Sequence, residues 1–323
     1  MDKILKVTGT IDTDGAFCAD PWFSYPGPRP VVAGKLKGEY SVFVYNGEGK
    51  RVAGIHFDAV NNARAYTANG PVAIEGVGIP VDVSVRLPEG AARVAVEKGG
   101  REIYSRDVPK SAPEVAFTGL AEGQGLDGKV ALTWEASGAD GHELHFEIWY
   151  YPREDVVFKL ATGVTGRSRE IDLSDCPGTE NGHFCIIVTD GVNTADSRSP
   201  GIRVPFRPPV ITTIQKETPQ LKDTQRLFFR VNVYDKQDGW LDRPPAPAPA
   251  PQKDRPPASG PEPSGSIVWR LNGEEFDRGE TLSTEPGALT PGVHTFTCTA
   301  TNSHGLSADK EFSFEVIPGE NEN

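Results

Sequence analysis

Three segments in the middle of this chain decide its fold: Leu132-Thr133-Trp134, Phe146-Glu147-Ile148-Trp149-Tyr150, and Phe184-Cys185-Ile186-Ile187-Val188-Thr189-Asp190-Gly191. They read as short alternating strands, and the last one leaves through an Asp-Gly pair that is typical of a tight turn. A period of two predicts strands that point one face at a partner sheet and the other at water. The segments therefore predict a small antiparallel β-sandwich.

The composition extends this prediction to the whole chain. Of the 323 residues, 37% are hydrophobic, 35 are Gly and 28 are Pro. This is the composition of a turn-rich β protein, and the sequence shows no amphipathic helix of useful length. One sandwich takes about 100 residues, so the length fits three of them. We expect an all-β chain of three tandem β-sandwich domains, arranged as an elongated rod with short Pro-containing joints.

Turn and strand signals place the first two domains at residues 1–110 and 111–206. In the first, strands at 40–45 and 52–57 flank a hairpin turn at 46–49, and Gly99-Gly100 closes a second hairpin. In the second, the three opening segments provide the central strands.

The third domain spans residues 207–323 and carries a Pro-rich insertion at 243–266. Its later strands turn at Asn272-Gly273. The insertion buries too little apolar surface to repay its ordering entropy, so we expect an extended, mobile loop. A passive spacer is the simpler interpretation, and recruitment of a proline-binding partner is the alternative.

The second domain resembles a fibronectin type III module, with its early Trp134 and the later Val-Thr-Asp-Gly-Val-Asn-Thr at 188–194. The third resembles an immunoglobulin-like or PKD-type domain, because Trp269 lies on one central strand and Phe296 precedes Cys298 by two residues on another. It lacks the earlier Cys of the immunoglobulin pattern, so no inter-sheet disulfide is expected there. The resemblance implies tandem modules of bacterial extracellular proteins, which are scaffolds more often than catalysts.

The charge and the hydropathy of the chain limit the classes of partner that we expect. The formal net charge of -12 repels phosphate backbones and anionic lipid surfaces, so nucleic acid is not expected. The longest apolar runs fall short of the ~20 residues of a membrane span, so no membrane insertion is expected. A strand pattern begins directly after Met1 and leaves no room for a signal peptide. The sequence therefore predicts either a cytoplasmic protein or a processed or excised piece of a larger one; the second is favoured and implies an extracellular or cell-surface location.

The four cysteines fall into two groups. Cys176 and Cys185 flank a turn-forming segment short enough to close, which favours a disulfide over two free thiols. Cys298 lies within an apolar strand and is expected in the core, and Cys18, next to Phe17, is expected there too.

Calcium is the best metal candidate, and no other cofactor is expected. Two clusters of hard oxygen ligands lie in predicted loops, although ordinary turn chemistry is the favoured explanation of both. Their members are Asp12, Asp14 and Asp20, and then Asp235, Asp238 and Asp242. A zinc-type site is not expected, because His142 and His145 are three apart on a strand and point to opposite faces.

The aromatic residues Trp22, Phe23 and Tyr25 precede a Pro-rich stretch and are candidates for an exposed binding loop, and with Tyr151 they could form a sugar-stacking or protein-docking face. The simpler interpretation is that most of these aromatic residues lie in the core. The sequence contains no nucleophile, metalloprotease or phosphate-binding motif, so we do not expect an enzyme.

These observations support three functions of different kinds. The leading hypothesis is a non-catalytic structural, adhesion or spacer segment of a bacterial extracellular or surface protein, whose partner is an unidentified protein or glycan or another copy of itself. The second is a set of accessory domains that follow the catalytic domain of a secreted peptidase or glycosidase. The third is a calcium-dependent or carbohydrate-binding module.

Overall fold

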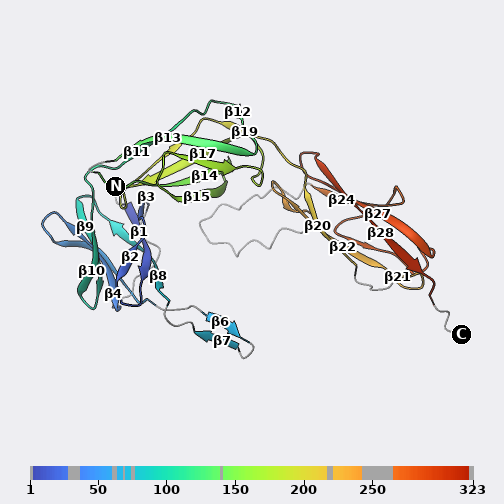
Figure 1. Cartoon of the computed structure of the whole chain (residues 1–323), viewed down its shortest axis with the longest axis horizontal. Helices are drawn as coiled ribbons and strands as arrows, with labels where there is room; N and C mark the ends of the chain where they lie inside the picture. The colour runs from blue at the N-terminus through green and yellow to red at the C-terminus, as the bar shows by residue number, and fades with distance from the viewer. Residues whose placement is uncertain are drawn as a thin grey trace. The chain divides into compact units, whose positions relative to one another are not determined.

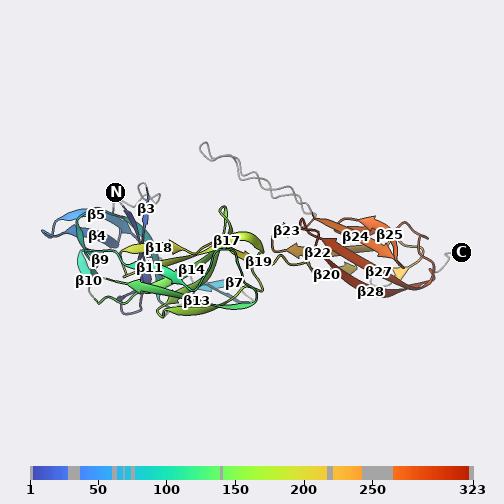
Figure 2. The same ribbon diagram turned by 90° about the horizontal axis from the view of Figure 1, so that it is seen from above.

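The computed structural model describes residues 3–27, 37–59, 64–67, 70–73, 77–138, 141–216, 221–241 and 265–319. All regular structure within these ranges is β-strand, as expected, and six of the sheets form three tandem immunoglobulin-like or fibronectin-like sandwiches (Figures 1 and 2). No helix in this part of the chain is long and apolar enough to cross a membrane. The predicted insertion at 243–266 lies outside the described residues up to position 264, and so does Asp242.

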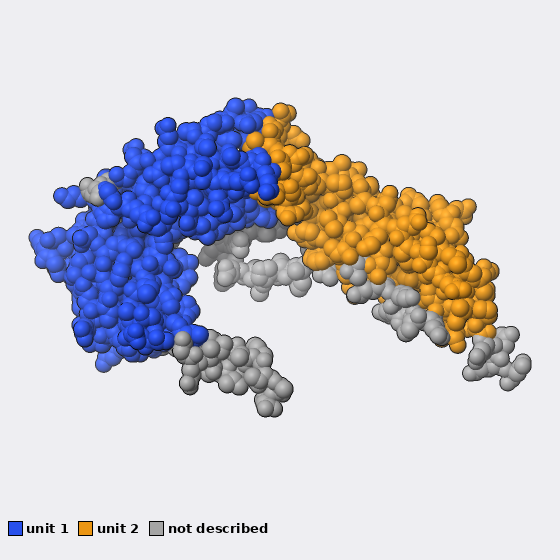
Figure 3. Space-filling view, viewed as in Figure 1, with its two compact units in different colours: residues 1–124, 129–171, 181–202 blue, residues 125–128, 172–180, 203–323 orange. Residues whose placement is uncertain are grey.

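The chain divides into two compact units, coloured separately in Figure 3. Unit 1 comprises residues 1–124, 129–171 and 181–202, and therefore contains the first sandwich and most of the second. Unit 2 comprises residues 125–128, 172–180 and 203–323, and contains the third sandwich with two short segments from the base of the second.

Two four-stranded sheets form the first sandwich, with a separate small hairpin that the sequence did not predict. One sheet has the order β2-β1-β3 with β8 on the other side of β1: β1 (Lys3–Ile11), β2 (Phe17–Ala19), β3 (Phe23–Pro26) and β8 (Ile79–Leu87). The other has the order β10-β9-β4-β5: β4 (Tyr40–Asn46), β5 (Arg51–Phe57), β9 (Ala91–Lys98) and β10 (Arg101–Asp107). The hairpin consists of β6 (Arg64–Thr67) and β7 (Gly70–Ala73).

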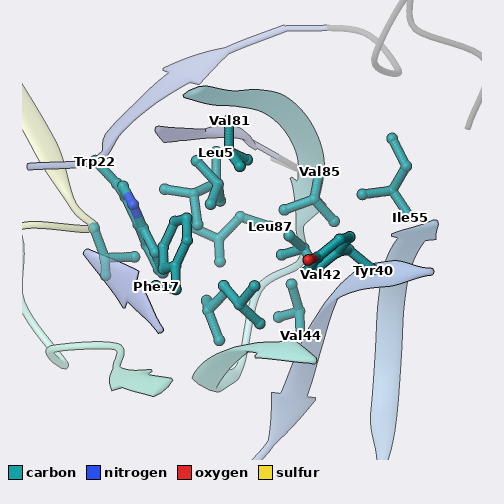
Figure 4. Packing of buried hydrophobic residues seen from close by; sticks show 14 of the residues in the cluster. Leu5, Phe17, Trp22, Tyr40, Val42, Val44, Ile55, Val81, Val85 and Leu87 are labelled. Carbon is teal, nitrogen blue, oxygen red and sulfur yellow. The ribbon is translucent and has the colours of Figure 1, made fainter. Parts of the chain in front are cut away.

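Alternate residues of both sheets fill the first core. Figure 4 shows Trp22 and Phe17 at one end of this cluster and Ile55 at the other. Trp22 is fully buried, and its Nε1 donates to the Thr8 carbonyl at 2.9 Å. Cys18 is exposed, which corrects the expectation of a core position, because Phe17 takes the inward side of the strand and its neighbour must point outward.

In the second sandwich, a three-stranded sheet faces a six-stranded one. The smaller sheet has the order β11 (Glu114–Thr118), β13 (Lys129–Ser137), β16 (Ser168–Asp172). The larger has the order β12 (Gln124–Gly125), β19 (Ile202–Val204), β17 (Thr179–Thr189), β14 (His145–Arg153), β15 (Val156–Val164), with β18 (Thr194–Arg198) also on β17. Trp134 and Phe146 are buried and tilted against each other at 5.3 Å between ring centroids, so both lie in the core.

The third sandwich packs a four-stranded sheet on a five-stranded one. The first sheet comprises β20 (Val210–Lys216), β22 (Phe228–Asp235), β23 (Gly239–Trp240) and β26 (Thr281–Ser283). The second has the order β21 (Leu221–Lys222), β28 (Ser307–Ile317), β27 (Gly292–Thr301), β24 (Ser266–Leu271), β25 (Glu274–Arg278). Trp269 is fully buried and donates from Nε1 to the Gly279 carbonyl at 2.8 Å, and Cys298 lies in the same core.

Two predicted hairpins have the turns that their sequences require. Asn272 and Gly273 have φ of 50° and 93°, and they join β24 to β25 as the two central residues of the turn. Gly99 and Gly100, with φ of 57° and 83°, do the same between β9 and β10. Positive φ at both positions matches the twist of the flanking strands, which is why Asn-Gly and Gly-Gly are favoured there.

Two valines of the third sandwich test where its core lies. Val231 is 1% exposed and Val293 is 73% exposed, so Val231→Ala should lower the free energy of unfolding by about 1–3 kcal/mol, whereas Val293→Ala should change it by less than about 0.5 kcal/mol. Urea titration of both variants, followed by the fluorescence of the buried Trp269, measures the difference. Equal losses would contradict the assigned core.

Candidate functional site

The turn between β17 and β18 forms a joint between the first two sandwiches, inside unit 1. Its Val192 is fully buried and belongs to the hydrophobic cluster of the first sandwich, which also contains Trp22. Gly191 forms an isolated antiparallel bridge with Trp22. A residue of the second sandwich thus completes the core of the first. Burial of a valine side chain stabilises by about 1.5–3 kcal/mol, which favours the docked arrangement.

Hydrogen bonds fix this turn against β3 on both sides. The Thr189 hydroxyl donates to the Trp22 carbonyl at 2.5 Å, and the Ser24 N–H donates to the Thr194 hydroxyl at 2.7 Å. Arg106 of β10 donates to the Gly191 carbonyl at 2.8 Å while its guanidinium lies 4.7 Å from the centroid of the Trp22 ring. These backbone groups of Trp22, Ser24 and Gly191 are therefore paired across the joint.

Asp190 and Asn193 hold the turn itself and the linker that enters the second sandwich. One Asp190 carboxylate oxygen accepts the N–H groups of Val192 and Asn193 at 2.9 and 2.7 Å. The Asn193 amide donates to the Pro109 carbonyl at 2.8 Å. Both side chains are at least nine-tenths buried and therefore shielded from water. Their hydrogen bonds to the turn and the linker take the place of the hydrogen bonds to water that they lose on folding.

A cleft of about 330 Å³ lies beside the joint, also within unit 1. The outer face of the first sandwich provides one wall through Lys6, Phe23 and Tyr25. The outer face of the second provides the opposite wall through Glu147 of β14 and Lys159 of β15. Strand alternation explains the arrangement, because Phe23 and Tyr25 point outward when Trp22 and Ser24 point inward.

Glu147 is a buried carboxylate in the wall of the cleft. Its residue is 8% exposed, and its carboxylate accepts Trp149 Nε1 and Lys159 Nζ, each at 2.9 Å. Lys159 also lies 4.9 Å from the centroid of the Trp149 ring. Burial, and secondarily the Glu147 charge, raises the pKa of Tyr25 to about 12, so its hydroxyl keeps its proton over the physiological range.

The structure corrects the predicted aromatic loop. Trp22 is a core residue, and Phe23 and Tyr25 lie on β3, paired with β1, instead of in a loop. Phe23 and Tyr25 still meet in the cleft, whereas Trp22 faces the core. Sequence reasoning missed Glu147 and Lys159, although the polar outward positions of the aromatic strand at 146–150 were a signal that could have pointed to Glu147.

The first predicted calcium cluster is organised as a turn. Asp12 Oδ1 accepts the N–H groups of Asp14 and Ala16 at 3.0 and 2.8 Å, which is ordinary Asx-turn chemistry. Asp20 lines the cleft near Lys6. Within the described ranges, no group of three His, Cys, Asp or Glu side chains is placed to hold a metal ion.

In the second cluster, Asp235 and Asp238 hold a second joint, inside unit 2. Asp235 Oδ1 accepts the N–H groups of Gln237 and Asp238, and its Oδ2 accepts the Asn302 amide at 3.0 Å. Asp238 accepts the backbone N–H and the hydroxyl of Ser303, both at 2.7 Å. The carboxylates are therefore hydrogen-bonded to protein groups; Asp242 lies outside the described residues.

The linker at the second joint is held in the same way as at the first. The Asn302 amide donates to the Arg207 carbonyl at 2.9 Å, and the Phe206 ring stacks on His304 at 3.7 Å between centroids. Lys236 donates to the Ser174 carbonyl and to Asp175 at 2.8 and 2.7 Å. A Cβ on Gly178 would lie 2.6 Å from the Phe206 Cα, so only glycine permits this approach.

The predicted disulfide is wrong for this structure, in which Cys176 and Cys185 are free, buried thiols. The segment between them is mostly strand, since β17 begins at Thr179 and continues to Thr189. Six residues of strand separate Thr179 from Cys185 by about 20 Å, and the three residues back to Cys176 recover at most about 10 Å. The Cα atoms are thus beyond the ~7 Å limit of a bridge.

One further pair has the composition of a catalytic site. Ser41 Oγ lies 2.7 Å from His56 Nδ1, as cross-strand neighbours on β4 and β5. The carboxylate of the nearby Glu97 accepts hydrogen bonds from the Tyr45 hydroxyl at 2.7 Å and from the Arg51 guanidinium at 3.1 Å. Among the described residues, no carboxylate is hydrogen-bonded to the His56 imidazole, so the geometry of the pair is that of a structural cross-strand bond.

Comparison with known proteins adds little to this description. The chain matches no known protein family and no curated protein. Among solved structures it is similar to a chimeric titin Z1Z2 functionalized with a KLER exogenous peptide from decorin, at 12% identity and a TM-score of 0.21, over 65% of this chain and 100% of that chain. A TM-score of that size carries no argument. The class is therefore assigned from the sheets and cores: the protein is a tandem array of immunoglobulin-like β-sandwiches.

Gly191 provides a test of the first joint. Its φ is 101°, and an added Cβ would lie 2.7 Å from the Arg106 guanidinium. The positive φ alone should cost alanine about 1–2 kcal/mol at Gly191, and Gly191→Ala should cost more because the displaced Arg106 also loses its hydrogen bond to the Gly191 carbonyl. The matched control is Gly141→Ala, where φ is 71° and nothing lies within 4 Å of the Cβ. Urea unfolding of the two variants compares them, and equal losses would contradict the packing described.

The cysteines provide a second test, by alkylation at about pH 8 and mass spectrometry. Burial raises the pKa of Cys176, of Cys185 to about 11 and of Cys298 to about 12, so few thiolates form at these positions. We expect iodoacetamide to label Cys18 first in the native chain and all four cysteines after unfolding without reductant. Only two labels after unfolding would restore the disulfide.

Proposed function

We propose that this chain is a non-catalytic structural or adhesion segment of an extracellular or cell-surface protein, in which buried joints hold the linkers between β-sandwich modules. The observation that carries the proposal is that an asparagine side chain binds each of the two linkers. Asn193 binds the Pro109 carbonyl of the linker into the second sandwich, and Asn302 binds the Arg207 carbonyl of the linker into the third.

The two asparagines occupy equivalent places in their modules. Asn193 lies in the turn after β17, and Asn302 lies in the turn after β27, the strand at the centre of the corresponding sheet. Each is also bonded to a buried aspartate, Asp190 at 3.3 Å and Asp235 at 3.0 Å. A linker carbonyl that is satisfied by a buried amide loses the freedom of a flexible tether. This favours a spacer or scaffold over a string of independent modules.

The non-catalytic part of the proposal is supported by how the polar groups are used. Asp12, Asp235, Asp238 and the Ser41–His56 pair are engaged in turns, joints or cross-strand bonds. The proposed location outside the cell is supported by the sequence resemblance. A disulfide would have added support, because disulfides form in oxidising compartments, but the cysteines are free thiols. Contact through loops and sheet faces, with a protein, a glycan or a second copy, is the corresponding mode of action.

Limited proteolysis of two single variants tests the proposal. Asn193→Ala leaves the Pro109 carbonyl without its partner and should cost about 1–3 kcal/mol, so we expect faster cleavage near residues 109–113. Asn302→Ala should do the same near residues 205–209. Mass spectrometry of the fragments locates the cuts.

Each variant is the control for the other. Asn193→Ala should leave cleavage at the second linker unchanged, and Asn302→Ala should leave the first unchanged. Linkers that are cleaved equally fast in the unmodified chain and in both variants are flexible tethers, and the scaffold proposal then fails.

A further inference from the structure

The cleft beside the first joint has the features of a ligand site that the scaffold role does not require. Its volume of about 330 Å³ lies within the range of small-molecule sites, about 300–1,000 Å³. It lies between two sandwiches that are locked together, so its walls are preorganised. Aromatic and polar side chains line the same space.

The two lysines of the cleft are paired with carboxylates, whereas Asp20, which also lines the cleft, has no ion-pair partner among the described residues. Lys159 is 2.9 Å from Glu147, Lys6 is 3.1 Å from Asp82, and His145 is 3.7 Å from Glu143. An anionic ligand would meet the Asp20 and Glu147 carboxylates and would have to compete with Glu147 for Lys159, in the least exposed of these pairs. The arrangement therefore disfavours an anionic ligand, whereas a neutral ligand leaves the pairs intact.

The polar groups retain hydrogen-bonding capacity of both kinds. The Glu147 carboxylate has about four acceptor positions and uses two of them, for Trp149 and Lys159. The Lys159 ammonium has three donors, and the Tyr25 hydroxyl both donates and accepts. A ligand rich in hydroxyl groups matches such a set, because every hydroxyl is also donor and acceptor.

Aromatic rings continue from the cleft along one face of β14. Phe23 is half-buried and Tyr25 is 36% exposed at the cleft wall. Trp149 and Tyr151 follow Glu147 at alternate positions of β14, so they lie on the same face of the sheet. Tyr151 stacks on His183 with 5.0 Å between ring centroids and a 7° angle between the planes. Tyr151 is thus engaged with His183, and Lys159 lies over the Trp149 ring at 4.9 Å, so Phe23, Tyr25 and the half-buried Trp149 are the rings that can offer platforms for the C–H faces of sugar rings.

We propose that the cleft between the first two sandwiches, with the adjoining face of β14, binds a neutral oligosaccharide. Tyr25 and Phe23 stack on one sugar ring, Glu147 and Lys159 bind its hydroxyl groups, and Trp149 stacks on a following ring. The site goes beyond the scaffold function but rests on the same joint, because the joint sets the distance between its walls.

Titration of the full chain with neutral hexasaccharides of glucose, mannose, xylose and N-acetylglucosamine tests the proposal, with heat of binding and tryptophan fluorescence as readouts. We expect at least one hexasaccharide to bind at millimolar concentration or below and to change the Trp149 emission. An oligogalacturonate and an oligolysine are the charged comparisons and should bind more weakly. Binding of the charged probes alone would overturn the proposal, and so would no binding by any neutral hexasaccharide.

Variants locate the site. Tyr25→Ala should weaken binding at least tenfold, and Tyr25→Phe should retain most of it because the ring remains. Glu147→Gln should also weaken binding. Tyr234→Ala is the matched control, since Tyr234 is an aromatic residue of the third sandwich with 40% exposure, and it should bind as the unmodified chain does. Equal affinity of Tyr25→Ala and Tyr234→Ala would place binding elsewhere and overturn the proposal.

Failure of this proposal is distinguishable from failure of the scaffold. Circular dichroism and limited proteolysis of Tyr25→Ala should match those of the unmodified chain, because Tyr25 lies outside the buried joint. Asn193→Ala should alter both cleavage at the linker and oligosaccharide binding. A chain whose linkers are protected but which binds no neutral hexasaccharide keeps the scaffold and loses the site.

Discussion

Insertion of Val192 into the core of the first sandwich is the contact on which the arrangement of unit 1 depends. A β-turn rarely places an apolar side chain outside its own domain, because turns are usually solvated. Here the turn completes a neighbouring core and its polar groups bond to Trp22 and Pro109. The apolar contact provides the free energy, and the hydrogen bonds define the register, since each unpaired buried group would cost about 1–3 kcal/mol.

The cleft is a consequence of this joint. Once the turn docks against β3, the outward residues of β3 face those of β14, and burial of Tyr25 in the cleft, with the Glu147 charge as a smaller cause, raises the pKa of the phenol. The two walls of the cleft come from residues 6–25 and 145–163, which are more than a hundred positions apart in the sequence. A scaffold joint and a ligand site are therefore compatible parts of one structure, in which the joint fixes the wall separation that a ligand would use.

Acidic residues show how one pattern supports two interpretations. Clusters of Asp and Gly in loops fit both calcium sites and turns, because both use carboxylate oxygens as acceptors. In the structure, Asp12 accepts hydrogen bonds within its own turn, and Asp235 accepts a hydrogen bond within the second joint. The spacing of Cys176 and Cys185 also fitted two interpretations. The Pro-Gly segment between them suggested a flexible loop that could close into a disulfide. In the structure, a strand begins at Thr179 and keeps the two thiols apart.

The sequence by itself determined the all-β class, the tandem sandwiches and the Asn-Gly and Gly-Gly hairpins, because each follows from alternation or local turn geometry. It also marked the Val-Thr-Asp-Gly-Val-Asn-Thr segment as a turn after a central strand. Only the tertiary structure decided what that turn touches, why Trp22 is buried, and which outward residues meet across the cleft. Period-two patterning says which face of a strand is apolar, but partners between domains depend on long-range packing that no local pattern encodes.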